Sequence, residues 1–291
     1  MIIDTKKQLE SLYSKDFSKY NNQLSVLMPC YNAEMYIKEA IESILNQTYE
    51  DFEFIIIDDH STDNTWLIVQ EYAQKDNRIR AYKNDINQYI AKNRNILLSF
   101  AESKYIAWMD SDDISLPNRL ENQIKVMEKN PEIGICGGFL EFFDDNYNNT
   151  SIRLYKEFDQ ELRKTIFKYS PVAQPASMVR LEVYNKVGVY NEKYPPAEDL
   201  DMSFRIGKFY KFYNLQDIII KYRVNENSAT FSNLKKMELS TLKVRYENKN
   251  FYKYTFLDIL YNITQLLFIF IMPSEFKIKL FNIIRNTKDS K

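Results

Sequence analysis

The chain has 291 residues, 45% of them hydrophobic and 15% aromatic, which is enough for a sizeable core in one large domain or two. Its formal net charge of −1 excludes the global basic field typical of nucleic-acid-binding proteins, and a lone histidine, His60, excludes zinc sites built from several histidines. Cys30 and Cys136 form no Cys-X-X-Cys pair, and the N-terminus shows no secretory signal, so we expect a cytoplasmic protein.

Short apolar segments alternate with amphipathic segments along the first half of the chain, after a polar leader at residues 1–22. Buried strands are predicted at residues 24–28, 54–57, 79–82 and 105–109. Helices are predicted at residues 37–45, 66–73, 90–101 and 117–130. Asn32 is the expected N-cap of the first helix. This alternation predicts an α/β fold with a Rossmann-like, mostly parallel sheet flanked by helices.

The second half of the chain is less regular. Its predicted elements are a strand at 133–143, a loop at 144–151, a helix near 159–168, a strand at 176–179 and a helix that ends at Gly188. A stiff loop with Pro195 and Pro196 then leads into a helix at 198–209. We expect a sheet domain over residues 23–225 and a helical appendage over residues 226–291.

Carboxylates collect where the predicted strands end: Asp58 and Asp59 follow the second, and Asp110, Asp112 and Asp113 follow the fourth. Ligands of parallel sheets bind beyond the carboxyl ends of the strands, so these positions predict a shared site. No Lys or Arg lies between residues 108 and 118. Two like charges about 4 Å apart repel by roughly 4 kcal/mol at an effective dielectric near 20. We therefore expect a hard divalent cation there, with phosphate completing its shell. Asp58 is explained equally well as a cap of the next helix.

Several ordered motifs resemble those of family 2 glycosyltransferases. They are LSVLMPCYN at 24–32, IESILNQT at 41–48, DDHSTD at 58–63, DSDD at 110–113 and ED at 198–199. The resemblance covers roughly residues 24 to 222. It implies a GT-A fold, a nucleotide-diphosphate sugar as donor, dependence on Mn²⁺ or Mg²⁺, and inversion of the anomeric configuration.

On this resemblance, the residues that would border the nucleotide are Pro29, Tyr31, Glu34, Asp59 and Arg94. Asp59 would hydrogen-bond the base, typically uracil, and Arg94 would help to line the base pocket. Two alternatives stay open: Arg94 pairs with an aspartate, and Tyr31 is an ordinary core residue.

The resemblance also assigns the chemistry. Asp112 and Asp113 would address the ribose and the metal–diphosphate, with Asp110 nearby, and Asp199 matches the catalytic base. A metal that bridges the two phosphates acts as a Lewis acid on the leaving group. A carboxylate such as Asp199 takes the proton of the attacking hydroxyl. One displacement with one base gives inversion.

The sequence departs from the family pattern at two turns. The family usually has glycine at the position of His60, and often near Asn87. Histidine and asparagine are among the non-glycine residues enriched at positive φ, so we interpret both changes as tolerated turn substitutions.

The expected function is metal-dependent, inverting transfer of a hexose from a UDP-sugar to a hydroxyl of a lipid-linked glycan acceptor, in the synthesis of O-antigen, capsule or lipooligosaccharide. The alternative is a haloacid-dehalogenase-like phosphatase with Asp110 as nucleophile and Asp112 as acid. Three strand–helix units precede the motif at 110–113, whereas the phosphatase signature normally follows an early strand. A sugar-nucleotide binder without catalysis is disfavoured by the intact Asp199.

Residues 257–272 are heavily apolar but are interrupted by Asp258, Asn262 and Gln265, so they fall short of a clean membrane span. Basic residues flank the segment: Lys249, Lys253, Lys277, Lys279 and Arg285. We expect a helix that lies in the membrane interface, on the cytoplasmic face of the inner membrane. The alternative is a core helix, or a helix that forms a homodimer.

Overall fold

The strands of this computed structural model form one mostly parallel sheet. The structure describes residues 1–19, 22–145, 151–224, 234–273, 276 and 287–289. The strands are β1 (Ile2–Ile3), β2 (Asn22–Cys30), β3 (Glu53–Asp58), β4 (Ile79–Asn84), β5 (Ser103–Trp108), β6 (Ile114–Ser115), β7 (Ile133–Phe143), β8 (Ser151–Arg153), β9 (Met178–Arg180), β10 (Lys211–Arg223) and β11 (Thr287–Asp289). Within the described residues their order is β1-β4-β3-β2-β5-β9-β7-β10-β6, with β8 paired to β7 and β11 to β8.

The neighbouring strands from β1 to β5 run parallel, as do β7 and β10. Strand β9 is inserted antiparallel between β5 and β7. The predicted mostly parallel α/β sheet is therefore confirmed. Residues 2–13 of the predicted leader form β1 and a helix, and β1 extends the sheet beside β4. The proposed domain boundaries stay a prediction.

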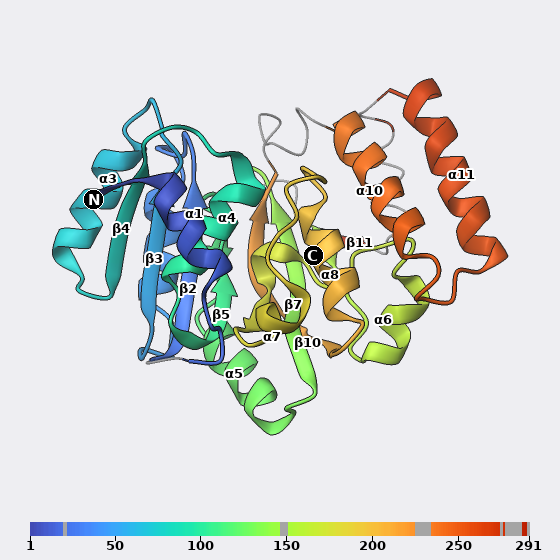
Figure 1. The fold of residues 1–291 in the computed structure, drawn as a ribbon, viewed down its shortest axis with the longest axis horizontal. Helices are drawn as coiled ribbons and strands as arrows, with labels where there is room; N and C mark the ends of the chain where they lie inside the picture. Colours follow the sequence, from blue (N-terminus) through green and yellow to red (C-terminus); the bar gives the residue numbers. More distant parts are fainter. Residues whose placement is uncertain (20–21, 146–150, 225–233, 274–275, 277–286, 290–291) are drawn as a thin grey trace.

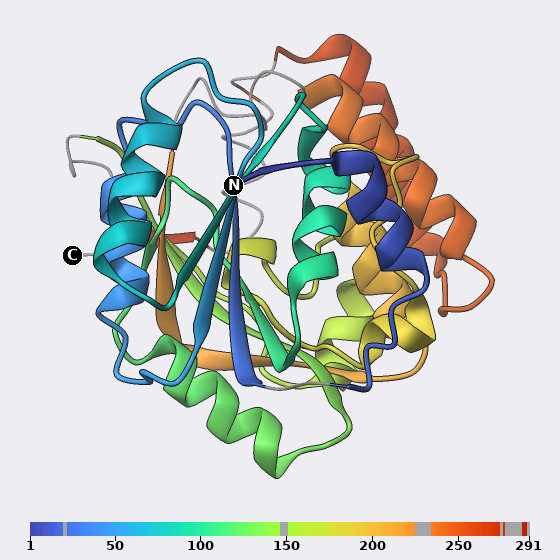
Figure 2. The same cartoon turned by 60° about the vertical axis from the view of Figure 1, so that its left-hand side comes forward.

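Helices cover both faces of the sheet (Figures 1 and 2). They are α1 (Thr5–Tyr13), α2 (Ile37–Leu45), α3 (Thr65–Lys75), α4 (Tyr89–Phe100), α5 (Arg119–Lys129), α6 (Asp159–Thr165), α7 (Val183–Val187), α8 (Glu198–Ile206), α10 (Leu234–Asn248) and α11 (Phe256–Ile271), with a short 3-10 helix at Gln174–Ala176. Helices α2, α3 and α5 share one buried cluster with the sheet, and α1, α4, α7 and α8 share the other. The appended helices α10 and α11 lie at the end of the molecule opposite α3 (Figure 1).

The local sequence explains these layers. Because β2 and β3 are covered on both faces, their segments are nearly continuous apolar runs. Helix α2 instead places Ile37, Ala40, Ile41 and Ile44 at helical spacing, and all four are buried against the sheet.

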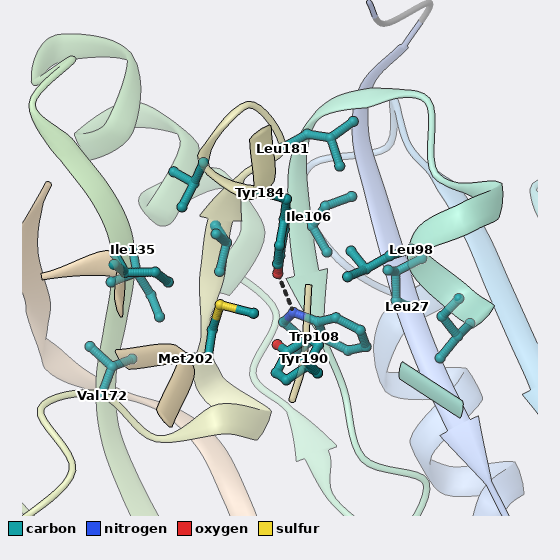
Figure 3. Close-up of a cluster of buried hydrophobic side chains, with 14 of the residues drawn as sticks. Leu27, Leu98, Ile106, Trp108, Ile135, Val172, Leu181, Tyr184, Tyr190 and Met202 are labelled. Carbon is teal, nitrogen blue, oxygen red and sulfur yellow. Dashed lines mark hydrogen bonds between the residues drawn. The ribbon is translucent and has the colours of Figure 1, made fainter. Parts of the chain in front are cut away.

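An aromatic cluster anchors the end of β5 (Figure 3). Trp108 Nε1 donates to Tyr184 Oη at 3.4 Å, and the Trp108 ring meets Tyr190 edge-on at a centroid distance of 5.5 Å. All three rings are buried. Buried aromatic pairs contribute about 0.5–1.5 kcal/mol beyond their area, so Trp108 fixes the point from which the chain turns at Asp110.

Two turn predictions have different outcomes. Helix α2 begins after Tyr36, so the prediction of Asn32 as its N-cap is wrong. Asn32 has a φ of 48° and accepts a hydrogen bond from Thr62 N at 2.9 Å, which ties the turn after β2 to the turn after β3. His60 has a φ of 66°, as its interpretation as a turn residue requires, whereas the positive φ near Asn87 falls at Tyr89.

Candidate active site

The turns that follow β2, β3 and β5 lie at one edge of the sheet. Asp59 N donates to Cys30 O at 2.8 Å, and Met109 N donates to Leu27 O at 3.1 Å. Parallel pairing therefore brings together the two carboxylate-bearing turns for which a shared site was predicted and the turn after β2, which the resemblance placed near the nucleotide.

The turn after β3 is held by its own aspartates. Asp58 is fully buried; it accepts hydrogen bonds from Ser61 and lies 3.2 Å from Lys83 Nζ. These contacts support the structural alternative for Asp58. Asp59 Oδ1 accepts from Asn84 Nδ2 at 2.6 Å and from Gln88 N at 2.8 Å. Burial raises the pKa of Asp59 above its ordinary value.

The turn after β2 presents the other residues expected near a nucleotide. Pro29 is buried within β2 opposite Ile57. Tyr31 is 50% exposed, which contradicts the alternative of an ordinary core residue. Glu34 Oε2 accepts from the backbone N of Asn64 at 2.8 Å, so Glu34 braces the start of α3 from the neighbouring turn.

Asp110-Ser111-Asp112-Asp113, here called the acidic turn, follows β5 directly. Asp113 is 1% exposed; its Oδ1 accepts from Arg223 N at 2.9 Å, and its Oδ2 is buried without a hydrogen-bond partner among the described residues. Burial raises the pKa of Asp113 well above its usual range. Burial, followed by the charge of Asp110, raises the pKa of Asp112 to about 6.

Part of the counter-charge comes from three arginines of the chain itself, which corrects the expectation that a cation bound from outside supplies it. Arg94 Nη2 lies 3.7 Å from Asp110 Oδ1. Arg119 is buried beside the turn, where its Nη2 donates to Trp108 O at 2.7 Å. Arg223 Nε donates to Asp112 O at 3.0 Å.

Arg223, which the sequence predictions do not include, holds the acidic turn in shape. It lies at the end of β10, where its backbone contacts Asp113 and its guanidinium contacts Asp112. The same guanidinium reaches Glu39 Oε2 at 2.5 Å and Asp145 Oδ1 at 2.9 Å. The β-branched run at 218–220 was the available sequence signal for a strand that ends at this arginine.

Arg94 joins the acidic turn to α8. Its Nη1 donates to Glu198 Oε1 at 2.6 Å, and both side chains are buried. Its guanidinium also lies 5.8 Å from the Trp108 ring and 5.7 Å from the Tyr190 ring. Burial raises the pKa of Glu198 to about 7. Of the two sequence readings of Arg94, pairing with a carboxylate is therefore observed, while its place in a base pocket stays a prediction.

We expect Arg94→Met to destabilise the fold by about 3–5 kcal/mol, because it leaves Glu198 buried without its cation. Arg94 normally lowers the pKa of Glu198, so that pKa rises further in the variant. When a carboxyl group has a higher pKa in the folded than in the unfolded protein, the free energy of unfolding falls as pH rises above the unfolded pKa, which is about 4.5 for Glu198. The destabilisation caused by Arg94→Met should therefore grow with pH. Urea denaturation at pH 6 and pH 8 measures it. Arg94→Met with Glu198→Gln should recover part of the loss; no recovery would contradict the pairing.

Asp199 stands in the first turn of α8, directly after Glu198. Its Oδ1 accepts from Leu200 N at 2.7 Å. Asp199 is half-buried, and burial raises its pKa above that of an ordinary aspartate. Because Glu198 is ion-paired with Arg94, Asp199 is the better placed of the two carboxylates to exchange a proton with a ligand.

The acidic turn offers oxygen ligands for a cation but no complete cage. Among the described residues, no group of three or more His, Cys, Asp or Glu side chains could hold a metal ion. Asp113 Oδ2, a buried carboxylate oxygen that lacks a donor, fits a hard cation, and the half-buried Asp112 is its neighbour. A divalent ion there would need phosphate or water oxygens to complete its shell.

Comparisons with known proteins show the family to which this chain belongs. The model of the family described as glycosyl transferase family 2 matches residues 25–188. An uncharacterised glycosyltransferase of Methanocaldococcus jannaschii is 37% identical over 266 residues, which cover 86% of this chain and 90% of that protein. The chain belongs to glycosyltransferase family 2. The resemblance of its motifs is thereby confirmed, and the phosphatase alternative is wrong.

Two further comparisons place this glycosyltransferase among its relatives. The Escherichia coli enzyme WfgD, named as a UDP-Glc:α-D-GlcNAc-diphosphoundecaprenol β-1,3-glucosyltransferase, is 42% identical over 123 residues, which cover 42% of this chain and 47% of WfgD. The mannosyltransferase PcManGT from Pyrobaculum calidifontis, solved with GDP-Man and Mn²⁺, has a TM-score of 0.63 at 14% identity and covers 90% of this chain and 75% of that one. The shared fold confirms the GT-A expectation.

Proposed function

We propose that this glycosyltransferase moves a hexose from a UDP-sugar to a hydroxyl of a lipid-linked glycan, with inversion and with the help of Mn²⁺ or Mg²⁺. One observation carries the proposal: a single guanidinium, that of Arg94, lies 3.7 Å from Asp110 and 2.6 Å from Glu198. The turn suited to a metal–diphosphate therefore lies close to the start of α8, where Asp199 follows Glu198, as a single displacement needs.

Residues of this chain position the metal–diphosphate and accept the proton of the acceptor hydroxyl. Asp112 and Asp113 would hold the metal, which when bound stabilises the charge that develops on the departing diphosphate. Asp199 takes the proton of the acceptor hydroxyl as its oxygen bonds to the anomeric carbon and the bond from that carbon to UDP breaks. The raised pKa of Asp199 brings its proton affinity closer to that of a useful base near neutral pH. Arg94 and Arg223 keep the two halves of the site in place.

The donor and the acceptor class are supported by the relatives. WfgD is named for UDP-glucose and for a diphosphoundecaprenol-linked acceptor, and PcManGT was solved with Mn²⁺. By likeness, we infer a lipid-linked acceptor and a role in bacterial surface polysaccharide synthesis, at the cytoplasmic face of the inner membrane.

We expect UDP release from one member of a UDP-sugar panel (glucose, galactose and their N-acetyl forms) only when a lipid-linked sugar acceptor and either Mn²⁺ or Mg²⁺ are present. A coupled assay for UDP measures turnover, and the NMR coupling of the new anomeric proton reports the configuration. An α-linked donor should give a β-linked product. Turnover that is unchanged in EDTA, or a retained anomeric configuration, would contradict the proposal.

A further inference from the structure

Helix α11 has its amphipathic pattern largely reversed: Asp258 and Asn262 face the protein, and most of its apolar side chains, Ile269 excepted, face outward. Asp258 and Asn262 are buried. Nine apolar residues are exposed, from 39% at Ile259 to 76% at Ile271. This outward face comprises Phe256, Leu257, Ile259, Leu260, Ile263, Leu266, Leu267, Phe270 and Ile271. The helix lies on the outside of the molecule in both views of the fold (Figures 1 and 2).

A buried arginine fixes this orientation. Arg245 on α10 is 5% exposed, and its Nη1 donates to Asn262 Oδ1 and to Gln265 Oε1, both at 2.8 Å. Its Nη2 donates to Lys168 O at 2.7 Å. Rotating α11 about its axis to bury its apolar face would remove these acceptors from the buried Arg245 guanidinium, which is unfavourable. Asn262 and Gln265 therefore attach α11 to the body, and so does Asp258, whose Oδ1 lies 3.8 Å from Lys168 Nζ.

Lysines border the outward face at both ends of α11. Lys235 Nζ lies 4.8 Å from the centroid of the Phe270 ring near the C-terminal end. Lys253 is exposed in the turn that precedes the N-terminal end. Lys236 is exposed next to Lys235. An apolar strip bordered by ammonium groups complements an interface that has acyl chains below and anionic headgroups above.

The length of α11 favours that interface over a membrane-spanning arrangement. Sixteen residues make a helix about 24 Å long, short of a hydrocarbon core of about 30 Å. No helix in the described part of the chain combines the length and the apolar composition of a membrane span. The nine exposed side chains offer an area comparable to the about 800 Å² that each partner of a stable dimer buries, so the bordering lysines, and not the area, favour lipid over a second copy of the chain.

We propose that the outward face of α11 docks the enzyme on a membrane that contains anionic lipids, with α11 lying in the plane of the interface. Docking also orients the site, because α10 is attached to the loop that leads into α8. Ser240 Oγ donates to Pro195 O at 3.3 Å, and Tyr194 Oη hydrogen-bonds Glu247. A second copy of the chain is the competing occupant. The predicted basic residues at 277–285 lie outside the described residues and are not needed for this inference.

Flotation of the full chain with vesicles tests the docking without donor or acceptor, so its outcome is independent of the proposed activity. We expect the protein to float with vesicles of phosphatidylcholine and phosphatidylglycerol, and the bound fraction to fall in 0.5 M NaCl as screening weakens the lysine contribution. Leu260→Ser with Leu267→Ser should lower the partition coefficient about tenfold or more, because each leucine loses apolar burial in the lipid.

The matched control is Leu67→Ser with Ile86→Ser, which removes two apolar side chains of similar or greater exposure away from α11. This variant should float like the unchanged protein. Thermal melts should show both variants folded, since all four side chains are more than half exposed. Equal flotation of the α11 variant and the control would overturn the proposal. So would sedimentation velocity showing a dimer that only the α11 variant dissociates, without lipid binding.

Discussion

Replacing Asp199 by Asn should lower the turnover of this glycosyltransferase by about 10²- to 10⁴-fold, the usual contribution of a general base. The amide cannot accept the proton of the acceptor hydroxyl. It can still accept the hydrogen bond that Asp199 Oδ1 receives from Leu200 N at 2.7 Å, so α8 should begin as before. Calorimetry should show UDP-sugar affinity nearly unchanged, and the UDP-release assay measures the loss of turnover.

Asp201→Asn is the matched control, because it makes the same change on the same helix. Asp201 is salt-bridged to Arg205 at 2.8 Å and has no assigned chemical role, so its variant should keep turnover within a few-fold of the original. Near-normal turnover in Asp199→Asn would refute the assignment of the base.

The pH dependence of kcat/KM should also report the protonation of Asp199. Burial raises the pKa of Asp199, so the base is protonated, and transfer is lost, at a higher pH than the ordinary aspartate value of 3.8 would give. The acid limb of kcat/KM is therefore expected above that value and should be absent from the residual activity of Asp199→Asn.

The sequence was sufficient to predict the part of the fold that carries the acidic turn and the turn after β3. Strands β2, β3 and β5 contain nearly continuous apolar runs, which identify buried parallel strands and so place the carboxylates that follow β3 and β5 at one edge. The positive φ of His60 was also accessible, because few residue types tolerate that conformation.

Strand β10 was not predicted, and the reason is physical. Its thirteen residues mix Asn214, Gln216 and Asp217 with apolar side chains, and its register against β7 shifts at three places. Each shift breaks the two-residue alternation by which a strand is recognised. Arg223, at the end of this strand, was missed for the same reason.

Two other features depend on contacts between distant segments. Arg94 and Glu198 are 104 residues apart, so the sequence could offer alternatives for Arg94 but could not choose among them. The apolar composition of α11 fits a buried helix and an interfacial helix equally well. Only the position of Arg245, which draws Asn262 and Gln265 inward, decides which face is exposed.

The second large effect concerns the cation. We expect UDP-sugar affinity to fall roughly 10- to 100-fold in EDTA and to a similar extent in Asp112→Ala with Asp113→Asn. That factor corresponds to the loss of one charged contact of about 1.5–3 kcal/mol. Asparagine at 113 keeps an oxygen to accept from Arg223 N, so the change removes charge without releasing the backbone of β10.

The decisive measurement is the combination of both changes. If Asp112 and Asp113 act through the metal, the variant in EDTA should bind no more weakly than the unchanged protein in EDTA, because both lack the same cation and the two losses cannot add. Asp145→Asn, which removes another carboxylate partner of Arg223 outside the acidic turn, should leave the EDTA effect intact. Additive losses would mean that the aspartates contact the nucleotide directly. If neither EDTA nor the double variant lowers the UDP-sugar affinity, the acidic turn binds neither a cation nor the nucleotide, and the repulsion among its carboxylates is offset in another way.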